Sequence, residues 1–120
     1  MEQITIEDFA KLQIKIGTIV SVSYIEGADK LLKLDIDLGE YGQDEEGNMI
    51  SVNRQILSGI REYVTDIESL VGKQVPVLTN LPTRKMKGLE SQGMILAGGD
   101  GDIFTLLHPE KVVPPGTEVR

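Results

Sequence analysis

The chain lacks cysteine and tryptophan, and its 120 residues include only one histidine, two phenylalanines and three tyrosines. The absence of cysteine excludes disulfides, thiolate zinc sites, iron–sulfur ligation and cysteine nucleophiles. The single histidine, His108, directly precedes Pro109 and has no second histidine and no carboxylate at ligand spacing, so we expect it in a loop or at a strand end. No metal and no cofactor are therefore predicted.

Long apolar runs and catalytic motifs are also missing. No stretch approaches the roughly 20 apolar residues that span a bilayer, and the N-terminus shows neither a basic nor an apolar leader region. Gly72-Lys73-Gln74 lacks the upstream glycine and the Ser/Thr of a phosphate-binding loop, and no Gly-x-Gly-x-x-Gly occurs. These absences predict a soluble, cytoplasmic protein that is not an enzyme and does not bind a membrane.

Acidic residues outnumber basic ones, but not evenly along the chain. The net charge of −7 and the pI of about 4.6 argue against nucleic-acid binding when the total alone is considered. Residues 1–50 hold four basic and eleven acidic residues, whereas residues 51–120 hold eight of each, so the whole deficit lies in the first part. This distribution is compatible with a local basic patch on an acidic protein.

Hydrophobic periodicity predicts short strands and two short helices. Thr5-Ile6-Glu7-Asp8 and Thr65-Asp66-Ile67-Glu68 are helix-start patterns, and Gly72 is placed to end the second helix. Gly17 is expected as a bulge or bend in the first strand, and Pro76 indicates an edge position or a bulge for the fourth. The predicted strands cover residues 12–24, 32–38, 50–57, 75–81, 94–97 and 103–107.

Three turn-rich segments complete the pattern. Residues 39–48 are expected to form a solvated hairpin loop, residues 98–101 a turn, and residues 113–116 a rigid, extended ending. The order of short helix, three strands, short helix and further strands suits an oligonucleotide/oligosaccharide-binding (OB) barrel, which places a helix between its third and fourth strands. We therefore predict an all-β, five-stranded OB-fold barrel with short helices and C-terminal extension strands, formed by one domain over residues 1–120.

The densest basic cluster is Arg84-Lys85-Met86-Lys87-Gly88, which follows the predicted fourth strand. It is either a solvated loop or a set of phosphate contacts, because cations bind phosphates by releasing counterions whatever the nucleotide sequence. Composition alone does not separate these alternatives.

Six stretches of the sequence together span nearly the whole chain and carry a family resemblance. They are residues 8–12, the segment from Val22 through 27–34, and residues 54–60, 71–73, 80–82 and 84–97, of which the last is long and of unusual composition. These stretches resemble the tRNA-binding domain family. That family occurs as the C-terminal appendix of methionyl-tRNA synthetase, as free-standing structure-specific tRNA-binding proteins, as an export-chaperone-like protein and in the endothelial-monocyte-activating polypeptide.

The resemblance implies an OB fold that binds tRNA by shape, near the outer corner of the L-shaped tRNA. It also implies a homodimer formed partly through residues 98–120. Four cations would contact phosphates, Ser91 would hydrogen-bond sugar or base, Met94 would offer an apolar platform to a base, and Asn80 is a weaker candidate. The implied tRNA-binding set is Lys30, Lys33, Arg54, Asn80, Lys85, Ser91 and Met94. The scarcity of aromatic residues favours structured RNA over a long single strand.

Two rivals to a tRNA carrier stay open at this point. One is an export-chaperone-like homodimer that binds extended polypeptide, and the other is a purely structural dimerisation domain. The carrier would act in trans or beside a methionyl-tRNA synthetase catalytic domain. The acidic stretch Tyr41–Asn48 is longer than the compact family pattern and would repel phosphate if it lay on the binding face.

Overall fold

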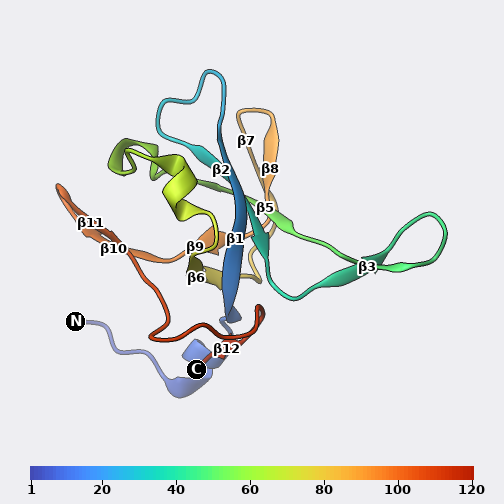
Figure 1. Ribbon diagram of the computed structural model, residues 1–120. Coiled ribbons are helices and arrows are strands. Elements are labelled where there is room, and N and C mark those ends of the chain that lie inside the picture. The colour runs from blue at the N-terminus through green and yellow to red at the C-terminus, as the bar shows by residue number, and fades with distance from the viewer.

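Six strands form the main antiparallel sheet of the computed structural model, which describes residues 1–120 (Figure 1), and five of them make up the barrel while β12 (Glu118–Val119) pairs with β1 beside it. The spatial order of the barrel strands is β5-β2-β1-β6-β9, and the helical segments η1 (Arg61–Tyr63) and η2 (Ile67–Leu70) lie between β5 and β6 along the chain. The strands of the barrel are β1 (Ile14–Tyr24), β2 (Leu32–Asp37), β5 (Arg54–Ser58), β6 (Gln74–Leu78) and β9 (Met94–Ile95). This order and the helical insertion match the five-stranded OB barrel that the sequence predicts.

β2 shows why the sheet curls around one core. Leu32, Leu34 and Ile36 are fully buried, whereas Lys33 and Asp35 between them keep partial exposure on the outer face. Each buried aliphatic side chain contributes about 1.5–3 kcal/mol relative to exposure. The core holds twelve buried residues, contributed by β1, β2, β5, β6, β9 and the neighbouring loops and helices.

The two end strands of this order, β5 and β9, meet along what we call the seam. Here the Gln92 N–H donates to the Gln55 carbonyl at 2.9 Å, and the Leu57 N–H donates to the Ser91 hydroxyl at 3.0 Å. The barrel is therefore nearly closed, and residues just before β9 complete it.

β1 contains a bulge, but not at the glycine that the sequence indicates. Its register with β2 shifts between Ile19 and Ser21, so Val20 is the extra residue, and it is exposed. Gly17 serves another purpose, because a Cβ at that position would collide with the side chains of Ile36 and Leu38. Glycine lets the two strands cross closely at this point.

Both predicted helix starts are present, with one correction. α1 (Ile6–Ala10) begins at Thr5 with a complete capping box to Asp8. η2 (Ile67–Leu70) is a short 3₁₀ helix whose N-cap is Asp66 rather than the predicted Thr65, and η1 (Arg61–Tyr63) precedes it. None of these helices has the length and apolar character needed to cross a membrane.

The predicted strand over residues 50–57 is wrong, because the chain divides there into two strands with different partners. β4 (Met49–Ser51) pairs with β3 (Tyr41–Gln43), whereas β5 pairs with β2. The β3–β4 hairpin, residues 40–53, projects sideways from the barrel (Figure 1), and we call it the acidic arm. The expected hairpin over residues 39–48 is thus longer than predicted.

The edge position predicted from Pro76 is also wrong, because β6 lies between β1 and β9. The Pro76 carbonyl accepts a hydrogen bond from the Leu96 N–H at 3.0 Å. The carbonyl and the nitrogen of one residue point to the same side of an antiparallel strand. The Pro76 nitrogen, which carries no hydrogen to donate, therefore faces β9 where this two-residue strand ends.

The C-terminal region forms a separate hairpin and a returning strand. β10 (Ala97–Asp100) pairs with β11 (Ile103–Leu106), and the expected turn at 98–101 is displaced to Gly101 and Asp102. The tail does not simply extend, because the chain turns at Pro115 and Gly116 and returns as β12 (Glu118–Val119) beside β1.

Candidate nucleic-acid interface

The predicted basic cluster lies on a hairpin formed by β7 (Arg84–Met86) and β8 (Leu89–Ser91), which we call the basic hairpin. Its two-residue turn has φ of 51° at Lys87 and 79° at Gly88, as a type I′ turn requires. Lys87 is the one residue other than glycine with positive φ in the structure. Asn or Gly usually fills this position, so a lysine places a cation at the tip at some conformational cost.

A small second core fixes this hairpin to the barrel. Met86 and Leu89 pack against the buried cluster of Ile25, Ala28 and Leu57. The basic hairpin therefore stands beside the loop that joins β1 to β2, at one end of the barrel (Figure 1). Because apolar contacts hold its inner face, its cations are presented from a fixed support.

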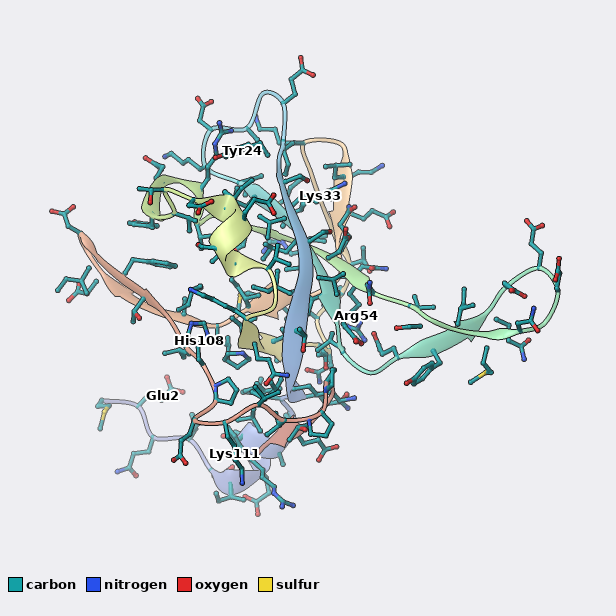
Figure 2. The ribbon with its side chains drawn as sticks, viewed as in Figure 1. Glu2, Tyr24, Lys33, Arg54, His108 and Lys111 are labelled. Atoms are coloured by element: carbon teal, nitrogen blue, oxygen red, sulfur yellow. The ribbon has the colours of Figure 1, made fainter.

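Lysines from both elements converge at this end. Lys30 and Lys87 line the same shallow cleft of about 250 Å³, and Lys33 lies on β2 opposite Leu57 of the second core (Figure 2). Lys30, Lys85 and Lys87 are exposed, and Lys33 is half-buried. Arg84, at the start of β7, adds a further exposed cation.

None of these cations has an ion-pair partner within the protein. The structure contains two salt bridges, Lys11–Asp8 and Arg54–Glu40. Two carboxylates lie near these cations without forming a salt bridge. Asp29 lines the cleft, and Glu90 is opposite Lys85 in the β7–β8 register. The cluster of Lys30, Lys33, Lys85 and Lys87, here called the lysine cluster, thus keeps its charge available for an external anion.

An aromatic–cation pair at the same end was not anticipated from the sequence. The Arg61 guanidinium lies 4.5 Å from the centre of the Tyr24 ring and donates to the Ala28 carbonyl at 2.8 Å. Tyr24 is 53% exposed. The 37-residue separation of the two residues gave no sequence signal, and only the fold of η1 onto the β1–β2 loop brings them together.

The Arg54 guanidinium, predicted as a phosphate contact, is paired with a carboxylate of the protein itself. Its Nε and Nη2 bind the two carboxylate oxygens of Glu40 at 2.7 and 2.8 Å. Hydrogen bonding to Arg54 lowers the pKa of Glu40, and the same contact raises the pKa of Arg54. The two side chains are thus held as a charged pair at the base of the acidic arm.

Ser91 and Asn80, predicted as tRNA contacts, also make hydrogen bonds within the protein. Ser91 is 3% exposed, and its hydroxyl accepts from the Leu57 N–H and donates to the Gly93 carbonyl. The Asn80 amide donates to the Lys11 carbonyl at 2.7 Å and accepts from the Gln13 N–H at 2.9 Å. Both side chains bind backbone groups of other segments, and Ser91 is buried whereas Asn80 is exposed.

Met94 keeps the exposure that its predicted role requires. It begins β9 opposite Leu78 and is 42% exposed. Met94 follows the C-terminal end of β8, which is the end farther from the turn at Lys87. Of the predicted set, Lys30, Asn80, Lys85 and Met94 are exposed, Lys33 and Arg54 are half-buried, and Ser91 is buried.

The acidic arm has an organised tip. The Asp44 carboxylate accepts from the N–H groups of Glu46 and Asn48, both at 2.9 Å, and the hydrogen bond from the Asn48 N–H is the main reason why the pKa of Asp44 is lowered. Glu45 and Glu46 are exposed beside it. Figure 1 shows this tip at the side of the barrel, whereas the basic hairpin stands at its end.

A nearly closed five-stranded antiparallel barrel with a helical insertion between its third and fourth strands defines an OB-like protein. Residues 14–118 match the family described as "Putative tRNA binding domain". The chain belongs to this tRNA-binding domain family, as the sequence resemblance predicted.

Curated relatives in this family carry the name methionine–tRNA ligase. The ligase of Methanococcoides burtonii is 52% identical over 115 residues, covering 95% of this chain, and that of Xanthomonas axonopodis pv. citri is 42% identical over 118 residues, covering 98%. The matched regions are 15% and 16% of those ligases. The chain therefore spans about one-sixth of the length of the relatives it matches.

Solved structures of two kinds share the whole fold. A MetRS-related protein from Pyrococcus horikoshii is 30% identical with a TM-score of 0.83, and each chain is covered completely. The chaperone CsaA from Bacillus anthracis is 27% identical with a TM-score of 0.79, covering 99% of this chain and 100% of the other. Family membership thus leaves both a tRNA-related and a chaperone-named relative to consider.

Proposed function

We propose that this chain is a non-catalytic module that binds tRNA by shape and backbone. The observation that carries the proposal is the lysine cluster, four cations without internal ion-pair partners on two elements joined by a second core. Phosphate contacts of this kind position a nucleic acid without specifying its sequence. Structured RNA is recognised through backbone and 2′-hydroxyl groups more than through duplex base edges.

Within this site the side chains take different roles. Lys30, Lys33, Lys85 and Lys87 contact phosphates, and Met94 offers an apolar surface to a base. The Tyr24 ring, already covered on one side by Arg61, keeps enough exposure to meet a second planar group. Such stacking contributes about 1–3 kcal/mol for each base.

The biological setting that fits is tRNA delivery in protein biosynthesis. The module would act in the cytoplasm, in trans or attached to a methionyl-tRNA synthetase catalytic domain, where it would raise the local concentration of tRNA. The names of the relatives support this setting.

A homodimer is part of the proposal. The N-terminal segment with α1 and the C-terminal tail lie at the opposite end of the barrel (Figure 1), and both expose apolar side chains. They are Ile4, Ile6, Phe9, Leu12, Val112 and Val119. Monomeric proteins seldom expose large contiguous apolar patches, so a second copy is the expected cover. Equilibrium sedimentation should give a dimer, and a well-folded monomer at high concentration would contradict it.

The test of tRNA binding is a filter-binding titration with folded tRNA, unfolded tRNA and duplex DNA at several salt concentrations. Four phosphate contacts predict a slope of log K against log salt of about −3 to −4. Lys85→Ala should reduce the magnitude of that slope by about 0.7–0.9 and weaken all tRNAs alike. Lys111→Ala is the matched control, since Lys111 is an exposed lysine far from the cluster (Figure 2). Equal binding of folded tRNA and duplex DNA would contradict recognition by shape.

A second candidate function, polypeptide binding, has its own supporting observation. A cleft of about 370 Å³ runs between η1–η2 and β11 and is lined by Tyr63, Leu70, Phe104 and Leu106. The Tyr63 and Phe104 rings stack with centroids 4.6 Å apart. Binding of an unfolded polypeptide that is lost in Phe104→Ser but kept in Lys85→Ala would favour this function.

A further inference from the structure

The Arg54 side chain joins segments that are far apart in the sequence. Besides the Glu40 carboxylate, its Nη1 donates to the Thr79 carbonyl at 2.8 Å and to the Gln92 carbonyl at 3.1 Å. Thr79 directly follows β6, and Gln92 lies in the link between β8 and β9. One guanidinium therefore connects the base of the acidic arm, the end of β6 and the seam of the barrel (Figure 2).

These contacts leave little capacity for an external anion. A guanidinium has five N–H donors in a fixed fork, and the hydrogen bonds to Glu40, Thr79 and Gln92 use four of them. The remaining donor is on Nη2, which already faces the Glu40 carboxylate. A phosphate approaching Arg54 would therefore meet a negative charge beside its only free donor.

The Gln92 contact carries the effect of Arg54 to the basic hairpin. Gln92 exchanges hydrogen bonds with Gln55, at 2.9 Å through its N–H and at 3.3 Å through its side-chain oxygen. Gln55 also donates to the Glu90 carbonyl at 2.9 Å. Ser91, between Glu90 and Gln92, binds the Leu57 N–H. The C-terminal end of β8 is thus fixed to β5 by a network that ends at Arg54.

We propose that Arg54 is a positioning residue for the RNA-binding face: paired with Glu40, it closes the seam and holds the basic hairpin in place, and it does not bind phosphate itself. This inference rests on the proposed tRNA binding. It differs from the family resemblance, which places Arg54 among the phosphate contacts.

Two substitutions distinguish a positioning role for Arg54 from a phosphate contact, because the two roles predict different tRNA affinities for each variant. Arg54→Lys keeps the positive charge but loses the planar fork, and lysine cannot bind Glu40 in bidentate fashion while also reaching two carbonyls. A phosphate contact would survive this change, whereas the network would not. Glu40→Gln removes a negative charge, which should strengthen RNA binding through electrostatics alone but weaken it if Glu40 fixes Arg54.

The experiment measures tRNA affinity for the wild type, Arg54→Lys, Glu40→Gln, Lys85→Ala and the double variant Arg54→Lys/Lys85→Ala. We expect Arg54→Lys to weaken binding by on the order of tenfold and Glu40→Gln to weaken it as well. The fold-loss of tRNA affinity in the double variant should be smaller than the product of the fold-losses in the two single variants, because Lys85 has already lost its position in Arg54→Lys. Leu70→Ala, a core truncation in η2, controls for a general loss of stability.

Amide hydrogen exchange provides a readout that needs no RNA. The Leu57 and Gln92 amides, both bonded across the seam, should exchange faster in Arg54→Lys and Glu40→Gln than in the wild type, and no faster in Lys85→Ala. Wild-type affinity in Arg54→Lys, tighter binding in Glu40→Gln and unchanged seam exchange would overturn the positioning role. Absence of tRNA binding by the wild type would instead contradict the proposed function, while the exchange result would still decide the role of Arg54 in the seam.

Discussion

The basic hairpin and the acidic arm are both two-stranded ribbons outside the main sheet, but they are supported in different ways. Met86 and Leu89 of the basic hairpin pack into the second core, whereas the arm exposes Tyr41, Met49 and Ile50 and is held at its base by the Glu40–Arg54 pair. An isolated hairpin is only marginally stable in water. The comparison indicates that apolar packing fixes the RNA-binding element and that polar contacts fix the arm at its two ends.

The largest expected effect tests this difference in support directly. Leu57 is 5% exposed in the second core and Ile50 is 42% exposed on the arm. Leu57→Ala should lower the free energy of unfolding by about 2–5 kcal/mol because it leaves a cavity, whereas Ile50→Ala should change it by less than about 0.5 kcal/mol. Urea denaturation of both variants checks this. Equal losses would mean that the arm is packed in solution as firmly as the basic hairpin.

The sequence predicted the supported parts of the fold better than the junctions between them. Alternation in β2 and the Thr5 capping box follow from local patterns, and both are present. The bulge at Val20 instead of Gly17, and the division of the third strand near Val52, depend on which strand pairs with which. Pairing is a tertiary property, so a single strand's pattern does not contain it.

The residues of the candidate site divide in the same way, into those with a local sequence signal and those whose contacts depend on the tertiary fold. Lys30 and Lys85, which the resemblance implies as phosphate contacts, lie in or beside turns, and both are exposed. Arg54, Asn80 and Ser91 are polar residues that each bind at least one backbone group 25 or more residues away. Sequence reasoning cannot tell such a residue from a ligand contact, because both roles require the same hydrogen-bonding group.

The next effect separates stability from binding within the basic hairpin. Lys87→Asn introduces a residue that tolerates the left-handed φ of 51°, so the free energy of unfolding should rise by about 0.5 kcal/mol or more. The lost cation should weaken tRNA binding and reduce the magnitude of the salt slope by about 0.7–0.9. Lys87→Gly should behave alike in both measurements, since it also relieves the turn and removes the charge. A variant that is more stable and binds equally well would remove Lys87 from the phosphate contacts.

A smaller effect is expected from the charges of the arm. Glu45→Gln/Glu46→Gln leaves the Asp44 turn intact and should change tRNA affinity by less than about twofold, because the tip lies at the side of the barrel, whereas the lysine cluster is at its end, and screening acts over about 8 Å at physiological salt. Glu90→Gln is the matched control, since Glu90 is opposite Lys85 in the hairpin, and it should tighten binding more. If the double variant binds markedly tighter than Glu90→Gln, the arm approaches the RNA and the two ribbons share one face.

The smallest effect concerns the turn at the tip of the arm and its dependence on pH. The hydrogen bond from the Asn48 N–H lowers the pKa of Asp44 in the folded state, so the carboxylate stabilises the turn at pH values above the unfolded pKa of about 3.9. That contribution is lost as the pH falls through the lower, folded pKa. NMR titration should therefore show the Asp44 carboxyl protonating below pH 3.9, together with shifts of the Glu46 and Asn48 amide signals. Asp44→Ala should make those amides exchange rapidly at all pH values, whereas Glu45→Gln should leave them protected, because Glu45 makes no hydrogen bond in the turn.

The seam amide of Leu57 should not respond in either variant, since the Arg54 network is anchored at Glu40, at the other end of the arm. A Leu57 response to Asp44→Ala would show that the tip and the seam are coupled, and that the arm is one rigid element rather than a ribbon fixed separately at each end.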